Sequence, residues 1–339
     1  MLLAISFATA LLVLLGVILF LWWLGHTVPQ KSTIAPSNKP PPLPDDLSEE
    51  DQLVTRVADP VVLPFSNSSL SEGELLNEIK MALAADFLTA VAIRCTKDET
   101  DSRLGGRPPK FKDFSWPHNQ LQPMTHIASI KLTELPHDHG LDFLPNTGWL
   151  SFFIDTKGFG AGHHPDDRKG FRVLYHADVD VESPEGEIPH DLNPSNCPLR
   201  RNIEFQIVKQ LPHDAFPDLE TSFESKQHLD LLDDFRMSLY GSPAHQMGGC
   251  VLAVQDPAME IDCEFLIHDI DPNGPEGRKS SRLGHHWEGI DEWRLLLQID
   301  SDPDLPLGEG EDGMLYFWVR RDQSIKEDFS NAWLIFQCT

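Results

Sequence analysis

Residues 148–154 read Gly-Trp-Leu-Ser-Phe-Phe-Ile, and residues 313–319 read Gly-Met-Leu-Tyr-Phe-Trp-Val. Each run opens with glycine and then carries almost only apolar and aromatic side chains, which is typical of a buried β-strand. Leucine and phenylalanine recur at matching places, as Leu150 with Leu315 and Phe152 with Phe317. The repetition predicts two copies of one strand-containing unit.

The segments around the two runs recur in the same order. Each half has a helical pattern, a Gly-Gly loop and two further apolar strands. In the first half, a Ser71/Glu74 capping box opens a helical pattern at Leu75, Ile79, Leu83, Phe87 and Val91. The Gly105-Gly106 loop and strands at 127–132 and 171–175 follow it. In the second half, the same order is a helix over 228–239, the Gly248-Gly249 loop and strands at 295–299 and 333–336.

This order predicts an α+β fold of two similar helix-plus-antiparallel-sheet halves, at about 71–190 and 216–339, that arose by internal duplication. Chance recurrence of aromatic strands that open with glycine is the competing interpretation.

The N-terminal segment predicts a single transmembrane helix over residues 1–24. It holds no charged side chain and would span about 36 Å as a helix, against roughly 30 Å of hydrocarbon. A cleaved signal peptide is the alternative, but the segment has no basic residue at its start. Lys31 and Lys39 follow the segment, which predicts that the domain lies on the cytoplasmic side of the plasma (inner) membrane.

Residues 25–66 are rich in proline and predict an extended linker, which leaves one folded domain over 67–339. Lys and Arg total 27 against 53 Asp and Glu, so the net charge is −26. A chain this acidic repels phosphate backbones, which argues against nucleic-acid binding. The five cysteines form no Cys-x-x-Cys pair, so neither a zinc ribbon nor a redox motif is indicated.

Three further segments, taken with the strands, resemble the YwqG-like family, a bacterial domain family of unknown function. They are the Gly-Gly-Arg-Pro loop at 105–108, the Leu-Pro-Asn-Thr-Gly-Trp-Leu run at 144–150 and the His-Gln-Met-Gly-Gly loop at 245–249. The resemblance covers about residues 71–339. It implies an α+β domain without an assigned activity, and some family members are thought to be immunity proteins beside bacterial toxins.

The two Gly-Gly loops are the predicted ligand-binding sites. Glycine allows close backbone approach and lets N–H groups face a ligand. The candidate residues are Arg103, Gly105, Gly106 and Arg107 in the first loop and His245, Gly248 and Gly249 in the second. A purely structural role as tight turns is the competing interpretation.

Acidic side chains at Asp300, Asp302, Asp304 and Glu311 match positions 1, 3, 5 and 12 of a calcium-binding loop, and they are weak metal candidates. Leu305 stands where that loop requires glycine, which favours a solvated acidic turn. Paired histidines at 137/139, 163/164 and 285/286 lack a metal-site spacing and are interpreted as loop residues.

No nucleophile, phosphate-loop or cofactor motif is present in the sequence. The sequence therefore predicts a membrane-anchored, non-enzymatic binding module that recognises a protein partner, and the resemblance implies that an immunity role is one option. An enzyme or small-ligand binder that uses a cleft between the two halves, with Arg103, Arg107 and His245 nearby, is the alternative.

Overall fold

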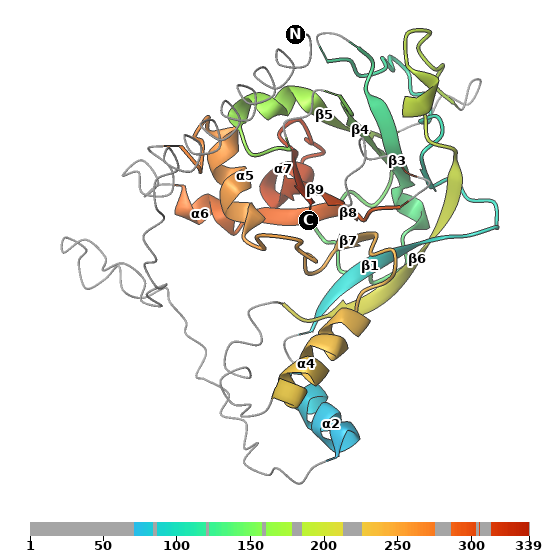
Figure 1. Cartoon of the computed structure of the whole chain (residues 1–339). Helices are drawn as coiled ribbons and strands as arrows, with labels where there is room; N and C mark the ends of the chain where they lie inside the picture. Colours follow the sequence, from blue (N-terminus) through green and yellow to red (C-terminus); the bar gives the residue numbers. More distant parts are fainter. Residues whose placement is uncertain are drawn as a thin grey trace, which may run out of the picture. The chain divides into compact units, whose positions relative to one another are not determined.

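The structure is a computed structural model, and it describes residues 71–83, 87–119, 122–157, 161–177, 185–212, 226–274, 286–302, 305 and 313–338. These residues form one antiparallel sheet with a few short helices (Figure 1). The strands are β1 (Leu88–Cys95), β2 (Arg103–Leu104), β3 (Thr125–Lys131), β4 (Trp149–Ile154), β5 (Phe171–His176), β6 (Arg201–Gln210), β7 (Gln246–Gly248), β8 (Trp293–Ile299), β9 (Gly313–Arg320) and β10 (Trp333–Cys338).

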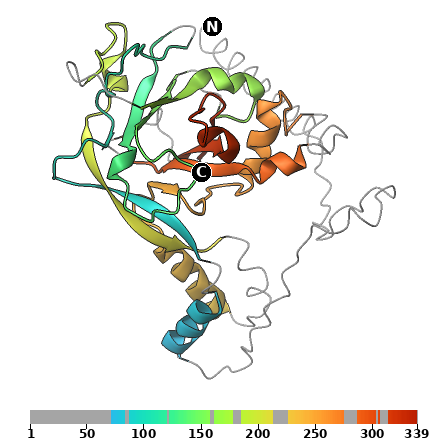
Figure 2. The ribbon, with the colours of Figure 1, turned by 180° about the vertical axis from the view of Figure 1, so that it is seen from behind.

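The helices are α2 (Glu72–Ala82), α4 (Lys226–Ser238), α5 (Met259–Ile267), α6 (Trp287–Ile290) and α7 (Arg321–Ser324), with short 3-10 helices η1 (Leu132–Glu134), η2 (Pro165–Gly170) and η3 (Pro194–Asn196). α2 and α4 lie against each other, away from the other helices (Figure 2). Ser71 begins α2, and its backbone N–H donates to the Glu74 carboxylate at 2.9 Å, as expected for a capping box.

The sheet is continuous, with the strand order β10-β9-β8-β7-β1-β6-β2-β3-β4-β5. The predicted α+β fold of two similar helix-plus-antiparallel-sheet halves is therefore wrong, because the chain is mostly β and has one ten-stranded sheet. β1 and β6 pair over all eight residues of β1, from Leu88 opposite Gln210 to Cys95 opposite Ile203. This pairing joins the strands of the N-terminal and C-terminal parts into one mostly β structure.

A single core also runs through both parts of the sheet. Phe152 of β4 and Phe317 of β9 are completely buried, and their rings meet edge to face with centroids 5.0 Å apart. β4 is buried at every position, so it is covered on both faces. A strand covered on both faces needs no polar alternation, which explains the nearly continuous apolar runs in the sequence.

The two edge strands of the sheet, β5 and β10, approach each other and nearly close it. The Phe336 N–H donates to the Ala161 carbonyl and the Trp333 indole N–H donates to the Gly162 carbonyl, both at 2.8 Å. The rings of Phe171 and Trp333 pack edge to face at 5.4 Å. We call this junction, made of residues 161–176 and 327–336, the seam.

Within the described ranges, no helix has both the length and the apolar character needed to cross a bilayer. The predicted transmembrane helix at 1–24 is therefore not part of the described fold. That segment and the predicted linker at 25–66 both lie outside the described residues.

Candidate functional site

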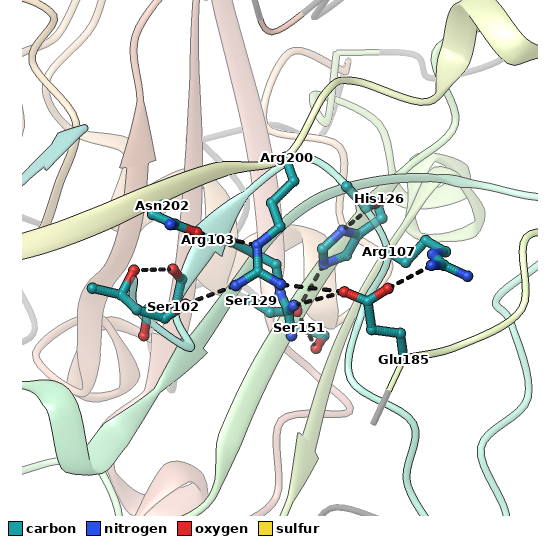
Figure 3. Close-up of polar contacts among 11 residues, drawn as sticks. Ser102, Arg103, Arg107, His126, Ser129, Ser151, Glu185, Arg200 and Asn202 are labelled. Carbon is teal, nitrogen blue, oxygen red and sulfur yellow. Dashed lines mark hydrogen bonds and ion pairs between the residues drawn. The ribbon is translucent and has the colours of Figure 1, made fainter. Parts of the chain in front are cut away.

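The first predicted loop is the centre of an arginine cluster on one face of the sheet. Arg103, Arg107 and Arg200 all converge on the carboxylate of Glu185, with N–O distances of 3.5, 2.7 and 3.2 Å (Figure 3). Arg103 is buried, and its guanidinium lies over the Trp149 ring at 5.8 Å. Burial, with the charge of Arg200, lowers the pKa of Arg103 to about 10, so Arg103 stays cationic at neutral pH.

The glycines of this loop make a packed turn. Gly105 and Gly106 have φ values of 62° and 67°, in the left-handed region that favours glycine. Their N–H groups donate to the carbonyls of Ile127 and Pro198, both at 2.8 Å. These donors are used within the fold, so the predicted binding of a ligand by the N–H groups of this loop is not supported.

The second loop has the same conformation, with φ values of 61° at Gly248 and 68° at Gly249. A Cβ at Gly248 would overlap Leu141, and a Cβ at Gly249 would overlap Ala90. The glycines are therefore required by close packing against β1 and the segment before β4.

A buried chain of hydrogen bonds lies beneath the arginine cluster. His126 Nδ1 lies 3.1 Å from the Gly106 carbonyl, and Nε2 lies 2.8 Å from Ser129 Oγ, which lies 2.8 Å from Ser151 Oγ (Figure 3). Because a carbonyl only accepts, Nδ1 carries the proton and Nε2 accepts from Ser129. The arrangement resembles a Ser-His dyad, but all three side chains are buried. No substrate can reach this serine, so the chain of bonds is structural.

Burial, with the charge of Arg103, lowers the pKa of His126 to about 3. The unfolded chain takes up this proton near pH 6.5 and the folded chain does not, so acid favours unfolding. We expect the free energy of unfolding to fall between pH 7 and pH 5 by about 2 kcal/mol more in the wild type than in His126→Gln. Urea unfolding at the two pH values measures this, with the exposed His190→Ala as the control. Equal pH dependence of wild type and His126→Gln would contradict it.

His245, the third residue of the predicted cleft, belongs to a different group. Its Nδ1 accepts from the Asp300 N–H at 3.0 Å, and its Nε2 lies 3.4 Å from the Asp302 carboxylate. Asp302 also pairs with Arg201 at 2.8 Å. Sequence reasoning missed Arg201, because its partner lies far along the chain.

This group and the arginine cluster lie on opposite faces of the sheet. Arg103 stands opposite Asn202 in the β2–β6 pairing, whereas Arg201 stands opposite Leu104. Adjacent residues of a strand point to opposite faces. Arg103 and Arg107 therefore come together as predicted, but His245 does not join them, and the predicted cleft with all three residues does not form.

The predicted metal candidates of the acidic loop have structural partners. Asp300 accepts from the Ala244 N–H at 2.8 Å, while Asp302 binds Arg201 and His245. Asp304 and Glu311 lie outside the described residues. A carboxylate held by an arginine is less available to Ca²⁺, so the geometry at Asp300 and Asp302 favours a structural turn.

The seam holds a cavity of about 590 Å³. Aromatic side chains form much of its wall, with the rings of Tyr175 and Phe329 at 5.6 Å from each other and Phe171 and Trp333 beside them. Cavities of this size and apolar character are typical of binding sites. Sequence reasoning missed this site because its walls come from segments that are about 160 residues apart.

Cationic side chains lie at the mouth of the cavity. Arg168, Lys169 and Arg172 line it together with one acidic residue, Glu327. Arg168 and Lys169 are exposed and form surface ion pairs, Arg168 with Asp269 at 3.3 Å and Lys169 with Asp166 at 3.2 Å. Such pairs contribute little, so an anionic ligand can compete for the two cations.

Comparison with known proteins identifies the family to which this chain belongs. A family model described as "Domain of unknown function (DUF1963)" matches residues 102–338, which extend from the start of β2 to the end of β10. The chain matches no curated protein. The matched segment is well over half of the 339 residues. This chain therefore belongs to the DUF1963 family, a family of domains of unknown function.

Proposed function

We propose that this chain is a non-enzymatic binding module that holds a carboxylate-bearing, extended segment of a protein partner in the seam cavity. The YwqG-like resemblance is part of this proposal, since a domain family of unknown function is consistent with it. The observation that carries the proposal is a cavity of about 590 Å³ whose wall is aromatic and whose mouth is basic.

The charge of the cavity argues for an anionic ligand. Three cations and one carboxylate line it, on a chain whose net charge is −26. Local charge complementarity sets specificity and excludes the wrong partner. A basic partner would be attracted to the rest of the surface but repelled from this cavity.

The aromatic wall argues for apolar side chains in the same ligand. Arg168 lies over the Trp333 ring at 5.6 Å, so cation and aromatic face are presented together. Aromatic and arginine side chains are the residues that dominate binding energy at protein interfaces. A peptide that alternates carboxylates with apolar side chains meets both features.

The burial of the Ser-His pair favours binding over catalysis. His126 and Ser129 are both sealed from solvent. A nucleophile must reach its substrate, and neither can. The cavity cations can bind and orient an anion without any bond being made or broken.

Binding of a synthetic eight-residue peptide of alternating Glu and Leu, and of its Gln counterpart, tests the proposal by calorimetry. We expect the Glu peptide to bind and Arg172→Glu to weaken it at least about tenfold, because a cation at the mouth becomes an anion. Lys97→Glu is the matched control, since it makes the same charge change at an exposed site away from the cavity.

Equal affinity of the Glu and Gln peptides, or equal affinity of Arg172→Glu and Lys97→Glu for the Glu peptide, would contradict the proposal. A cavity of this volume also suits a small molecule. Binding of free glutamate with loss in Arg172→Glu, but no binding of the peptide, would instead indicate a small anionic ligand.

A further inference from the structure

Glu264, His268 and His286 form a cluster outside the seam and the arginine cluster. Glu264 and His268 are one helical turn apart at the end of α5, and His286 immediately precedes α6, the helix packed beside α5 (Figure 1). Their three ligand atoms lie within 4.8 Å of one another. Sequence reasoning placed histidine 286 in a loop and did not connect it with α5.

One oxygen of the Glu264 carboxylate, Oε2, is held by two donors on strands. Oε2 accepts from the Arg320 guanidinium at 2.6 Å and from the Trp293 indole N–H at 2.8 Å. Glu264 is buried, so this orientation is fixed. Hydrogen bonding to one oxygen of a carboxylate is how proteins commonly orient a metal ligand.

The other oxygen, Oε1, is turned toward both imidazoles. It lies 3.2 Å from His268 Nε2 and 3.9 Å from His286 Nδ1. The two rings lie with centroids 4.1 Å apart. Two nitrogens and one carboxylate oxygen therefore converge on one point at the α5–α6 junction.

The backbone of Gly289 in α6 packs closely against Oε1. A Cβ at this position would overlap the Glu264 carboxylate. Only a residue without a side chain therefore fits at this position while Oε1 stays where it is. The contact between Gly289 and Glu264 is independent of the two histidines and involves the same carboxylate oxygen, Oε1.

We propose that Glu264, His268 and His286 bind a divalent transition metal ion of the Zn²⁺ class. Two imidazoles and a carboxylate are a common protein ligand set for Zn²⁺ and leave a fourth position for water. Donor atoms about 2.0–2.1 Å from a tetrahedral ion stand roughly 3.3–3.4 Å apart. The 3.2 Å distance from Oε1 to His268 Nε2 already fits this spacing, while His286 Nδ1 lies 3.9 Å from Oε1, about 0.5 Å beyond it, on a partly exposed side chain.

The ligand set selects against the hard cations. Ca²⁺ and Mg²⁺ prefer six or more oxygen ligands, and this site supplies one carboxylate oxygen. Arg320 holds the other oxygen, so Glu264 binds as a monodentate ligand. The site is distinct from the Asp300 loop, where Arg201 and His245 bind the carboxylate of Asp302.

Titration of the full chain with Zn²⁺ after treatment with a chelator tests the proposal. Calorimetry gives affinity and stoichiometry, and Co²⁺ substitution adds a visible absorption band that reports nitrogen and oxygen ligation in a site of low coordination number. His268→Ala and His286→Ala are the variants, because both side chains are partly exposed and their loss leaves the Glu264–Arg320 pair in place.

We expect one Zn²⁺ per chain, affinity reduced at least about tenfold in each histidine variant, and no change in His190→Ala. Gly289→Ala is expected to weaken binding too, because its methyl group displaces Oε1. Absence of Zn²⁺ binding by the wild type, or Zn²⁺ binding that survives both histidine variants, would overturn the proposal. None of these residues carries the peptide-binding proposal, so the two experiments fail or succeed separately.

Discussion

Replacing Gly162 by alanine is expected to lower the free energy of unfolding by about 3–5 kcal/mol. The new Cβ would overlap the Leu334 carbonyl of β10, and the backbone has a φ of 80°, which strains any residue with a side chain. The overlap would push β10 from the seam. The bonds from Trp333 to the Gly162 carbonyl and from Phe336 to the Ala161 carbonyl would be lost with it.

Urea unfolding followed by circular dichroism measures this loss. Gly73→Ala is the matched control, because no atom lies within 4 Å of a Cβ at Gly73 in α2. Alanine is the better helix former, so this control is expected to be neutral or more stable by up to about 1 kcal/mol. The same unfolding midpoint in both variants would show that the seam does not close as described.

Removing the Asp302 carboxylate is expected to cost about 3–5 kcal/mol of folding free energy. Asp302 is largely buried and pairs with Arg201, and it lies beside the buried His245. Asp302→Ala removes the carboxylate that lies 2.8 Å from the Arg201 cation, in a site that is only about one fifth exposed. A buried charge that loses its partner is among the most destabilising changes in a protein.

Two comparisons make this prediction specific. Asp166→Ala breaks an exposed pair with Lys169 and is expected to leave the unfolding midpoint almost unchanged. The double variant Arg201→Met/Asp302→Leu removes both charges and is expected to recover much of the loss. If Asp302→Ala and Asp166→Ala were equally stable, the buried pair would not hold β6 to the segment after β8.

The strands that contain the apolar runs were predictable from local sequence. Strands predicted at 127–132, 148–154, 171–175, 295–299, 313–319 and 333–336 correspond to β3, β4, β5, β8, β9 and β10. Their continuous burial made the pattern strong. The Ser71/Glu74 cap at the start of α2 was equally local and is confirmed.

Four strands were missed, the short β2 and β7 and the longer β1 and β6, and it is β1 and β6 that join the two parts of the sheet. Positions 87 and 91 fit the spacing of the preceding helix, but α2 ends at Ala82 and Val91 lies in β1. A short apolar run fits helix or strand equally well, so periodicity cannot decide between them. β6 does alternate, with Ile203, Phe205 and Ile207 separated by polar residues, and that signal could have identified it.

The predicted site residues come together only where they were neighbours in sequence. Arg103 and Arg107 meet at Glu185, whereas His245 binds Asp302 on the other face. The spacing of Glu264 and His268 on a helix was visible in the sequence. Only the packing of α6 on α5 adds His286, so the complete cluster could not be predicted.

The sequence by itself determined which segments are buried strands, where glycine is required and how acidic the chain is. These properties depend on residues that are close together along the chain. Tertiary structure alone decided that the strands form one sheet and that its edges meet around a cavity. It also decided that His268 and His286 both lie beside the carboxylate of Glu264. Strand pairing and side-chain convergence depend on backbone hydrogen bonds and packing between residues far apart in sequence, and a local pattern does not specify a distant partner.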